Sequence, residues 1–520
     1  MAEVALKHEK AKLVRTLKRW DLVFFSVCAI IGLDAVAGLA KWGLGQGIVW
    51  FIIFLFLFLL PYGFVTAELG AAFPAEGGIY TWARMAYGKL PGEITAILYW
   101  ISNAIWIGGS LAGVTIASIN GFFLEPNGKA DVGLAGQIII GLVFVWVCIA
   151  IAVISLKHGK WAGNIGAWVK AIAVIAFAIL VVANLAKNGV PHGIAAGSTY
   201  APSITGFLAV IGAIIFLFVG FELESGASEE MTNPQHDVPI GILRSGIITS
   251  ALYIIVLLGI LFTLPVKELT QSSGLTGAFS LVNKTVIGTG GGAKFIGYLF
   301  GIVVILTLVG SGSVWILGSC RVQAVAALDG AAPRGLGKFG AQGTPTTMAW
   351  LSGIIGSIFV VAVFWISHIS SASNASSGAK TLDNAMAVFL GIALSTAVLA
   401  YIFTIPATIT LRKKFPDVHR PFIVPGGQFG LWLSVILAEI GIILTGFTLL
   451  WPGLIDGVLG QKYDIVSSWG VSRKFFELTT LGTFIIIILV GVVFWAWGKA
   501  QTKGIETTEK DLLEGVVEEA

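Results

Sequence analysis

The sequence predicts an all-α membrane protein with twelve transmembrane helices, and its composition supports this fold class. Hydrophobic residues make up 56% of the 520-residue chain, whereas charged residues make up only 12%. Because soluble globular proteins carry roughly 25% charged residues, this chain lacks the charge to cover a water-exposed surface of its size. Glycine is abundant, at 66 residues, but no collagen repeat exists, and the excess of apolar residues excludes a disordered chain.

Twelve stretches of the chain are long and apolar enough to cross a bilayer, which takes about 20 residues. These stretches are residues 21–45, 48–72, 94–124, 134–156, 161–186, 206–230, 241–264, 294–328, 346–367, 384–411, 429–451 and 475–498. The stretch at 294–328 exceeds the required length, so we expect it to extend beyond the membrane or to contain a break. An even number of helices places both ends of the chain on the same side.

Both ends are expected in the cytoplasm, in a multi-pass protein of the cell membrane. Residues 1–20 form a basic, polar tail without signal-peptide features, so the first apolar stretch is expected to remain as a transmembrane helix. With this orientation, 21 Lys and Arg residues lie in cytoplasmic segments and 10 in external segments, as the positive-inside rule requires. Residues 499–520 are expected to form a solvated acidic tail.

Neither a metal, a disulfide nor a cofactor is expected. Cys28, Cys148 and Cys320 lie far apart without a C-x-x-C spacing, and the six histidines are isolated. The net charge of +4 is too small and too dispersed to indicate a nucleic acid partner.

A few ionisable residues fall inside the predicted helices, where each costs several kcal/mol unless it is paired or hydrated. Glu68 and Glu439 are expected nearer to helix ends, where their side chains can reach the interface. The others lie deeper, and they are Asp34, Lys170, Glu222 and Glu224.

The first and the sixth predicted helices share a pattern in which glycines flank a carboxylate. Helix 1 reads Gly32-x-Asp34-x-x-x-Gly38, and helix 6 reads Gly220-x-Glu222-x-x-x-Gly226. Because five helices separate the two copies, the second would enter the membrane from the opposite side. That arrangement is typical of an inverted repeat with interrupted helices at matching positions. It predicts a first repeat at 21–190, a second repeat at 200–411 and two further helices at 429–498.

Glycines beside a carboxylate allow a helix to unwind within the membrane. Unwinding frees backbone N–H and C=O groups that lipid cannot satisfy but a polar ligand can. The freed helix ends also carry partial charges that suit an anion or a cation. The alternative is that these glycines serve only close helix packing. The occurrence of two matching motifs favours a binding site.

At these residues the chain resembles the amino acid–polyamine–organocation (APC) superfamily of secondary transporters, over nearly its whole length. The most specific segment runs from Phe218 through Glu222 to Asn233-Pro234 and Pro239. The other similar segments are Ile30–Asp34, Ala67–Tyr80, Arg321–Pro333 and Arg420–Phe422. The resemblance implies a LeuT-like fold of five plus five inverted helices, with discontinuous helices 1 and 6 and two C-terminal helices.

The resemblance also implies where the substrate binds. Residues 32–38 would form the break in helix 1 and residues 218–222 the break in helix 6, with Phe218 or Phe221 as an aromatic gate. The alternative for each phenylalanine is simple packing. The implied substrate-binding residues are Gly32, Leu33, Asp34, Ala35, Ala37, Gly38, Phe218, Gly220, Phe221 and Glu222.

Lys170 resembles the helix 5 lysine whose ammonium replaces a sodium ion in sodium-independent members of the superfamily. Its position about nine residues into the predicted helix makes snorkelling to the interface a poor alternative. The resemblance therefore implies a role for Lys170 in coupling.

Asp34 departs from the superfamily pattern, which has a glycine at this position. An ionised carboxylate there would repel a substrate carboxylate by about 4 kcal/mol at 4 Å and an effective dielectric constant of ~20. Either Asp34 points away, or it is protonated, or the substrate presents a cation to it.

These features predict a secondary amino acid transporter that works by alternating access, independent of sodium and driven by protons or exchange. The alternative is a polyamine or organic-cation transporter of the same fold that uses Asp34, Glu222 and Glu224. No P-loop, metalloprotease or hydrolase motif occurs, which argues against an ATPase or an enzyme, and no filter-like repeat indicates a channel. The expected partners are a small-molecule substrate, the lipid bilayer and protons.

Overall fold

The computed structural model describes residues 17–40, 42–124, 132–154, 160–189, 203–264, 274–340, 343–373, 378–460 and 471–502. Within these residues the chain is helical, with an isolated bridge between Leu17 and Met231 and no strand. Most of the predicted tails, at 1–20 and 499–520, therefore lie outside the described residues.

Eleven helical segments of the described chain are long and apolar enough to span a membrane. They are Gly45–Ala72, Lys89–Leu124, Gly133–Ile154, Trp161–Asn188, Ile204–Gly226, Pro234–Leu261, Gly291–Leu328, Thr346–Ile369, Ala385–Lys414, Gly427–Leu450 and Arg473–Gln501. Each overlaps one of the stretches predicted from the sequence. The remaining stretch, at 21–45, is interrupted and forms α2 (Arg19–Ile30) and α3 (Leu33–Ala40). The chain is therefore a multi-pass membrane protein.

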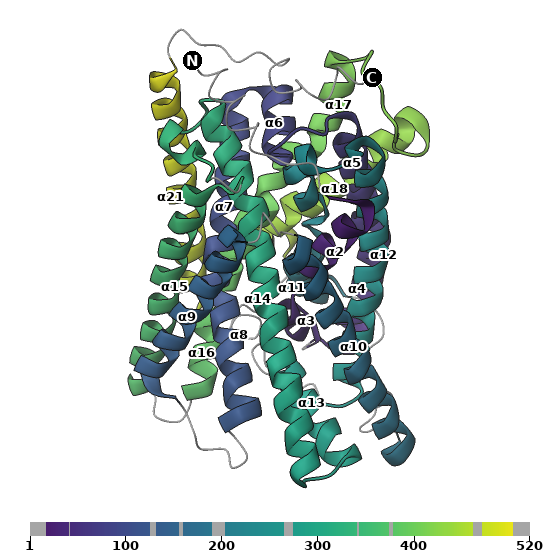
Figure 1. Cartoon of the computed structure of the whole chain (residues 1–520), viewed down its shortest axis with the longest axis vertical. Coiled ribbons are helices and arrows are strands. Elements are labelled where there is room, and N and C mark those ends of the chain that lie inside the picture. The colour runs from purple at the N-terminus through teal and green to yellow at the C-terminus, as the bar shows by residue number, and fades with distance from the viewer. Residues whose placement is uncertain are drawn as a thin grey trace.

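The spanning segments contain α4 (Val49–Phe54) and α5 (Leu60–Ala72), α7 (Lys89–Trp106) and α8 (Ala112–Ile119), α9 (Gly133–Ile154), α10 (Lys160–Asn188), α11 (Ile204–Phe218) with η5 (Phe221–Glu230), α12 (Pro234–Leu261), α14 (Gly291–Leu328), α15 (Thr346–Ser373), α16 (Gly378–Leu399) with η8 (Ala400–Ile402) and α17 (Thr404–Lys414), α18 (Gly427–Leu450) and α21 (Arg473–Gln501). Two shorter helices, α6 (Ile79–Tyr87) and α13 (Gly274–Val286), lie at opposite ends of the bundle (Figure 1).

Helix α14 is continuous over 38 residues, so the long predicted stretch extends beyond the membrane and contains no break. At ~1.5 Å per residue it is about 57 Å long, whereas the hydrocarbon core of a bilayer is about 30 Å thick. Glu439 was expected near a helix end, and this was wrong, because residue 439 lies midway along α18 just as it does in the predicted stretch at 429–451.

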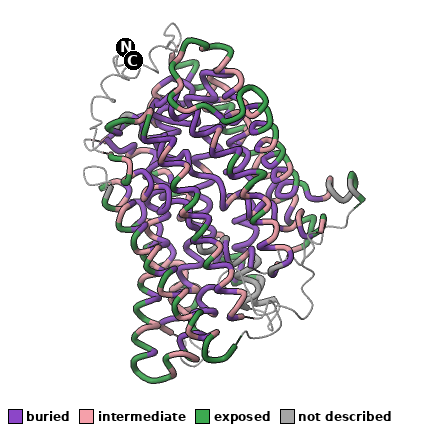
Figure 2. Tube along the Cα trace, turned by 90° about the vertical axis from the view of Figure 1, so that its right-hand side faces the viewer, coloured by how far each residue is buried: buried purple, intermediate pink, exposed green. Residues whose placement is uncertain are grey.

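The outer surface of the bundle carries large apolar side chains, as a lipid-facing surface requires. Exposed examples lie on α10 (Ile175, Ile179) and on α21 (Ile485, Ile486, Leu489). Buried residues lie inside the bundle, while exposed ones follow the outward faces of its helices (Figure 2). The broken helix α2–α3 and the segment α11–η5 lie within this interior.

Gly220 occupies a left-handed backbone conformation, with φ +105°, between α11 and η5. A Cβ at this position would lie 2.6 Å from the ring of Trp315. Gly288 has nearly the same φ, +106°, but a Cβ there would meet nothing within 4 Å. The two glycines therefore share a backbone constraint and differ in the space around them.

We predict that Gly220→Ala destabilises the protein more than Gly288→Ala. Both variants lose roughly 1–2 kcal/mol from the left-handed conformation, and Gly220→Ala loses about 1–3 kcal/mol more from overpacking against Trp315. Thermal unfolding in detergent, measured side by side, checks this difference. Equal melting temperatures for the two variants would contradict the contact between Gly220 and Trp315.

Candidate functional site

The break between α2 and α3 is short and consists of Ile31 and Gly32. Helix α2 ends at Ile30, Ile31 is extended, and α3 begins at Leu33, so Gly38 lies inside α3 and not in the break. The carbonyl groups in the last turn of α2 have no N–H groups of a following helical turn to accept from. Bulk water does not replace these donors in the interior of a membrane protein. Partners for these groups must come from neighbouring helices.

Helices α10 and α14 supply several of these partners. The ammonium of Lys170 on α10 donates to the carbonyl oxygens of Cys28 and Ile31, the latter at 2.8 Å, and to the Ser311 hydroxyl on α14. Ser311 donates to the Cys28 oxygen at 3.2 Å, and the indole N–H of Trp315 donates to the Ala29 oxygen at 2.9 Å. Lys170 is thus held at the first break, away from either interface.

Tyr253 on α12 bridges the two sides of the same break. Its hydroxyl donates to the Ile30 oxygen at 2.5 Å and accepts from the Gly32 N–H at 3.1 Å. One side chain therefore satisfies both the end of α2 and the glycine that separates it from α3.

The second break, between α11 and η5, consists of Val219 and Gly220. Helix α11 ends at Phe218, Val219 is extended, and Gly220 turns the chain through its positive φ into the 3-10 helix η5. The Gly220 N–H lies 3.2 Å from Glu222 Oε2 and 3.3 Å from the Tyr62 hydroxyl. The backbone N–H at this break is therefore bonded by a side chain only two residues further along the chain.

Glu222 is surrounded by three tyrosines from three different elements. Its Oε2 accepts from the Tyr62 hydroxyl of α5, in addition to the Gly220 N–H. Its Oε1 accepts from the Tyr99 hydroxyl of α7 at 2.7 Å and from the Tyr401 hydroxyl of η8 at 2.6 Å. These four donors match the capacity of one carboxylate. Glu222 therefore joins η5 to α5, α7 and η8.

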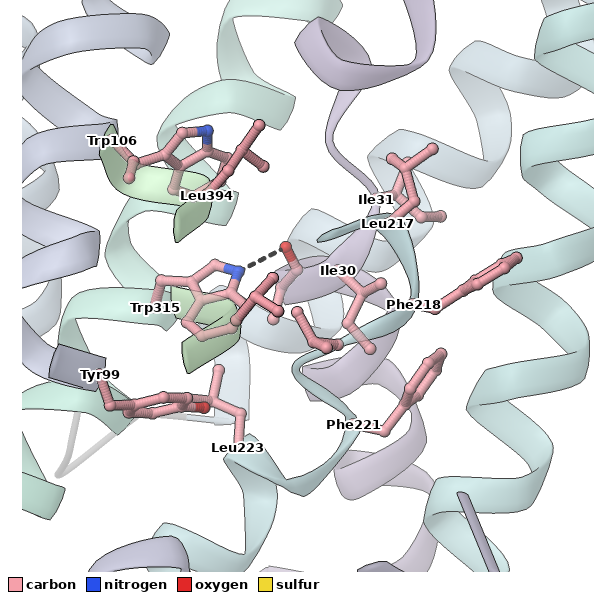
Figure 3. Packing of buried hydrophobic residues seen from close by; sticks show 14 of the residues in the cluster. Ile30, Ile31, Tyr99, Trp106, Leu217, Phe218, Phe221, Leu223, Trp315 and Leu394 are labelled. Carbon is pink, nitrogen blue, oxygen red and sulfur yellow. Dashed lines mark hydrogen bonds between the residues drawn. The ribbon is translucent and has the colours of Figure 1, made fainter. Parts of the chain in front are cut away.

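The two breaks meet at an aromatic column formed by Trp106, Trp315 and Tyr99 (Figure 3). The ring of Trp315 lies 6.4 Å from that of Trp106 and 5.7 Å from that of Tyr99. Trp315 also bonds to Ala29 at the first break and packs against Gly220 at the second. Trp315 therefore contacts both breaks.

Phe218 and Phe221 lie on the other side of the breaks, away from the column (Figure 3). Phe218 packs against Phe51, with ring centroids 4.8 Å apart. Both phenylalanines are buried. In the structure, both side chains therefore act as packing residues. The role of either ring as a gate stays a prediction.

Other predicted residues are only partly described. The backbone of Leu33, Asp34, Ala35 and Ala37 belongs to α3, but their side chains lie outside the described part of the structure. Glu224 lies within η5 but does not join Glu222, because its carboxylate accepts from Ser26 of α2 at 2.7 Å.

A polar cluster closes the bundle at the end of α14. Asp329 Oδ2 accepts from the Tyr80 hydroxyl at 2.5 Å and from Arg84 Nε at 3.0 Å, and Lys89 Nζ lies 3.5 Å from Oδ1. Burial and the Asp329 carboxylate raise the pKa of Tyr80 well above its usual value, so this hydroxyl keeps its proton and remains a donor. The cluster ties α6 and α7 to α14.

The sequence alone indicated Glu222 and Lys170 but none of the aromatic partners. These missed residues are Tyr62, Tyr99, Tyr253, Trp315 and Tyr401. A signal was present, because a buried tyrosine hydroxyl or indole N–H normally requires a hydrogen-bond partner.

A family model described as amino acid permease matches residues 17–466 of the chain. The chain is 29% identical over 420 residues to a probable agmatine/putrescine antiporter, AguD, of Lactococcus lactis subsp. lactis (strain IL1403), covering 81% of this chain and 84% of the relative. It is 24% identical over 489 residues to the branched-chain amino acid permease BcaP of Bacillus subtilis (strain 168), covering 91% and 97%.

Among solved structures, the fold resembles that of MhsT, crystallised in complex with L-phenylalanine. The TM-score is 0.52 at 14% identity, and the match covers 93% of this chain and 99% of the MhsT chain. At this identity the likeness concerns the fold alone.

We predict that Tyr401→Phe destabilises the protein by about 1.5–3 kcal/mol, because it removes a hydrogen bond to a buried carboxylate while the ring stays in place. Tyr87→Phe is the matched control, since the Tyr87 hydroxyl accepts from Thr410 at the surface, and it should change stability by less than about 0.5 kcal/mol. Thermal unfolding of both variants measures the difference. Comparable effects would contradict the importance of the Glu222 cluster.

Proposed function

This chain belongs to the amino acid permease family, and on that premise we propose a secondary active transporter that moves amino acids by alternating access, independent of sodium. Its relatives are transporters, so the chain is a transporter and not an enzyme. The observation that carries the proposed mechanism is the meeting of two helix breaks at Trp315, within the bundle interior. Broken helices supply a substrate with backbone groups while their halves rock around the site.

The proposed architecture has twelve transmembrane helices. The α2–α3 pair counts as the first, and the eleven other spanning segments follow it. The breaks then fall in helices 1 and 6, which supports inverted repeats at 21–190 and 200–411, with two further helices at 429–498. The N-terminal tail at 1–20 and the acidic tail at 499–520 complete this division.

The surroundings of Lys170 support transport without sodium. Its ammonium lies among the Cys28 and Ile31 carbonyl oxygens and the Ser311 hydroxyl, which are oxygen donors of the kind that bind a metal cation. A positive charge that belongs to the protein occupies this position. Loss or gain of a proton by Lys170 would change the partners of the first break, which couples protons to the conformation of α2.

The hydrogen bonds of the Glu222 cluster support a role for Glu222 in holding the second break in one conformation. Movement of η5 relative to α7 and η8 must exchange the hydrogen bonds of Tyr99 and Tyr401 for others. Substrate contacts with residues 218–222 would favour that exchange, and the residues of the first break, 32–38, would complete the site. Trp315 covers both breaks and is the aromatic side chain best placed to contact a substrate.

The distribution of cations supports cytoplasmic ends in a cell-membrane protein. Helices α6 and α17, at one end of the bundle, carry a set of basic residues. That set is Arg84, Arg412, Lys413 and Lys414. Basic residues concentrate on the cytoplasmic side of membrane proteins, so this end is assigned to the cytoplasm.

A specific observation favours a polyamine as a second candidate substrate. Tyr253 already bonds to the Gly32 N–H and to the Ile30 oxygen, groups that a free amino acid would use for its carboxylate and its amine. A substrate without a carboxylate would not compete with Tyr253 for the Gly32 N–H. The relative AguD is named as a probable agmatine/putrescine antiporter, which agrees with this alternative.

We predict that purified protein in proteoliposomes takes up labelled amino acids, because backbone groups at both breaks suit an amine and a carboxylate. Uptake of leucine, arginine, aspartate and putrescine, each competed against the others, identifies the class. Putrescine uptake that no amino acid inhibits would replace the amino acid proposal with the polyamine one. Absence of uptake or exchange of any probe would reject both.

We predict that Lys170→Met reduces uptake and removes its pH dependence, because it keeps the aliphatic stem but deletes the ammonium between the two carbonyls. Lys187→Met is the control on the same helix, since Lys187 is exposed and donates to the Thr285 oxygen at the surface. Uptake at several pH values, at matched expression, measures the effect. A wild-type pH profile in Lys170→Met would remove Lys170 from coupling.

A further inference from the structure

Two carboxylates on η5 lie two residues apart in very different surroundings. Glu222 and Glu224 are each 1% exposed. Glu222 accepts from three tyrosines and a backbone N–H, which compensates a negative charge. Glu224 faces α2 and α12, on another side of the same helix.

Glu224 has a single donor among the described residues. Ser26 of α2 donates to Oε2 at 2.7 Å, whereas Oε1 has no hydrogen-bond partner in the part of the chain that the structure describes. Gly241 of α12 leaves room for this oxygen, since a Cβ there would lie 2.6 Å from Oε1. The carboxyl group is therefore seated between α2, η5 and α12.

The charged groups around this seat do not neutralise Glu224. No ion pair to Glu224 occurs among the described residues, and the nearby Glu222 and Asp237 are themselves acidic. The elements packed against η5 are α2, α5, α6, α12 and α14. Many of their charged and titratable side chains have partners elsewhere. These pairs are Asp21 with Asn164, Arg19 with Asp237 and His236, Tyr62 with Glu222, Glu68 with Arg412 and Arg420, Tyr80 and Arg84 with Asp329, Arg244 with the ring of Trp20, Tyr253 with Ile30 and Gly32, and Arg321 with Glu76.

A buried carboxylate with one hydroxyl donor and no cation is unstable as an anion, because an uncompensated buried charge costs several kcal/mol. A proton on the carboxyl group removes that charge. The surroundings of Glu224 thus favour the neutral carboxylic acid, whereas the tyrosine cluster around Glu222 favours the carboxylate anion.

The donor to Glu224 belongs to α2, which is separated from α3 by the break. Helix α2 has 12 residues and ends at Ile30, so a pivot at Ile31 and Gly32 would move it relative to α3. Such a pivot would withdraw Ser26 from Glu224 and admit water from the end of α2 that carries Arg19. Hydration would then stabilise the ionised carboxylate.

We propose that Glu224 is a proton-binding site of the transport cycle, separate from the substrate site, that holds a proton while α2 packs on η5 and releases it to water when α2 withdraws. This inference rests on the proposed transport function. Substrate and proton would then bind on different faces of η5, and the position of that helix couples them. Glu224 would not be a ligand of a polyamine.

Infrared difference spectroscopy of the full-length protein in lipid tests the protonation directly, without a substrate. The C=O stretch of a protonated carboxyl group should be present at neutral pH in the wild type and reduced in Glu224→Gln. Glu222→Gln is the matched control, and it should leave that band in place because Glu222 accepts from four donors. A band that Glu224→Gln does not change would overturn the proposal.

Uptake of leucine, arginine and putrescine by proteoliposomes at several pH values tests the role in transport. Glu224→Gln imitates the protonated acid, so it should keep wild-type thermal stability and lose the pH dependence of uptake. Glu477→Gln, which removes a carboxylate that pairs with Arg473 and accepts from the Gly453 N–H, should keep the wild-type profile. If Glu224→Gln does not fold, Glu224→Asp should shift the profile instead.

The outcomes separate this inference from the proposed function. Uptake by Glu224→Gln with an unchanged pH profile would overturn the role of Glu224 and leave the transporter intact. Failure of the wild type to move any probe would overturn the transporter, and with it the role of Glu224 in a transport cycle.

Discussion

Backbone groups freed inside a membrane must find partners within the protein, and this requirement organises the interior of the structure. Helix α2 ends far from bulk water, and the carbonyl oxygens of its last turn accept from Lys170, Ser311, Trp315 and Tyr253. These side chains come from α10, α12 and α14, so the break fixes the positions of three other helices. The interruption of helix 1 is therefore the point at which the bundle is tied together.

At the second break, the partner of the free backbone N–H is the side chain of Glu222, which three tyrosine hydroxyls hold in place. Polar groups in a low-dielectric interior are costly when unpaired and strongly held when paired. One turn of η5 thus contains a carboxylate bonded by four donors and, at Glu224, a carboxyl group with one donor among the residues that the structure describes. The contrast comes from the neighbours of each residue, since the two share the same helix and the same depth.

The sequence predicted the helices and the places where two of them break, because apolar length and flanking glycines are local features. It also indicated Lys170 and Glu222, since a charge in an apolar stretch is visible without a structure. The partners were not predictable, because a tyrosine such as Tyr253 in an apolar run looks like a packing residue until its neighbours are known. The pairing of Arg321 with Glu76 was not predictable for the same reason. The side chain of Asp34 lies outside the described residues, so its orientation stays a prediction.

Helix α14 is continuous and contributes side chains both to the first break and to the polar cluster at its C-terminal end. Ser311 and Trp315 bond to the first break, while Arg321 and the following Asp329 bond to side chains at the far end. A continuous helix keeps these groups in a fixed angular phase, about 100° per residue. Inserting or deleting a single residue between Trp315 and Arg321 would rotate the side chains that bond to the first break relative to those that bond at the far end of the helix. The length of this stretch is therefore constrained more tightly than the identity of most residues within it.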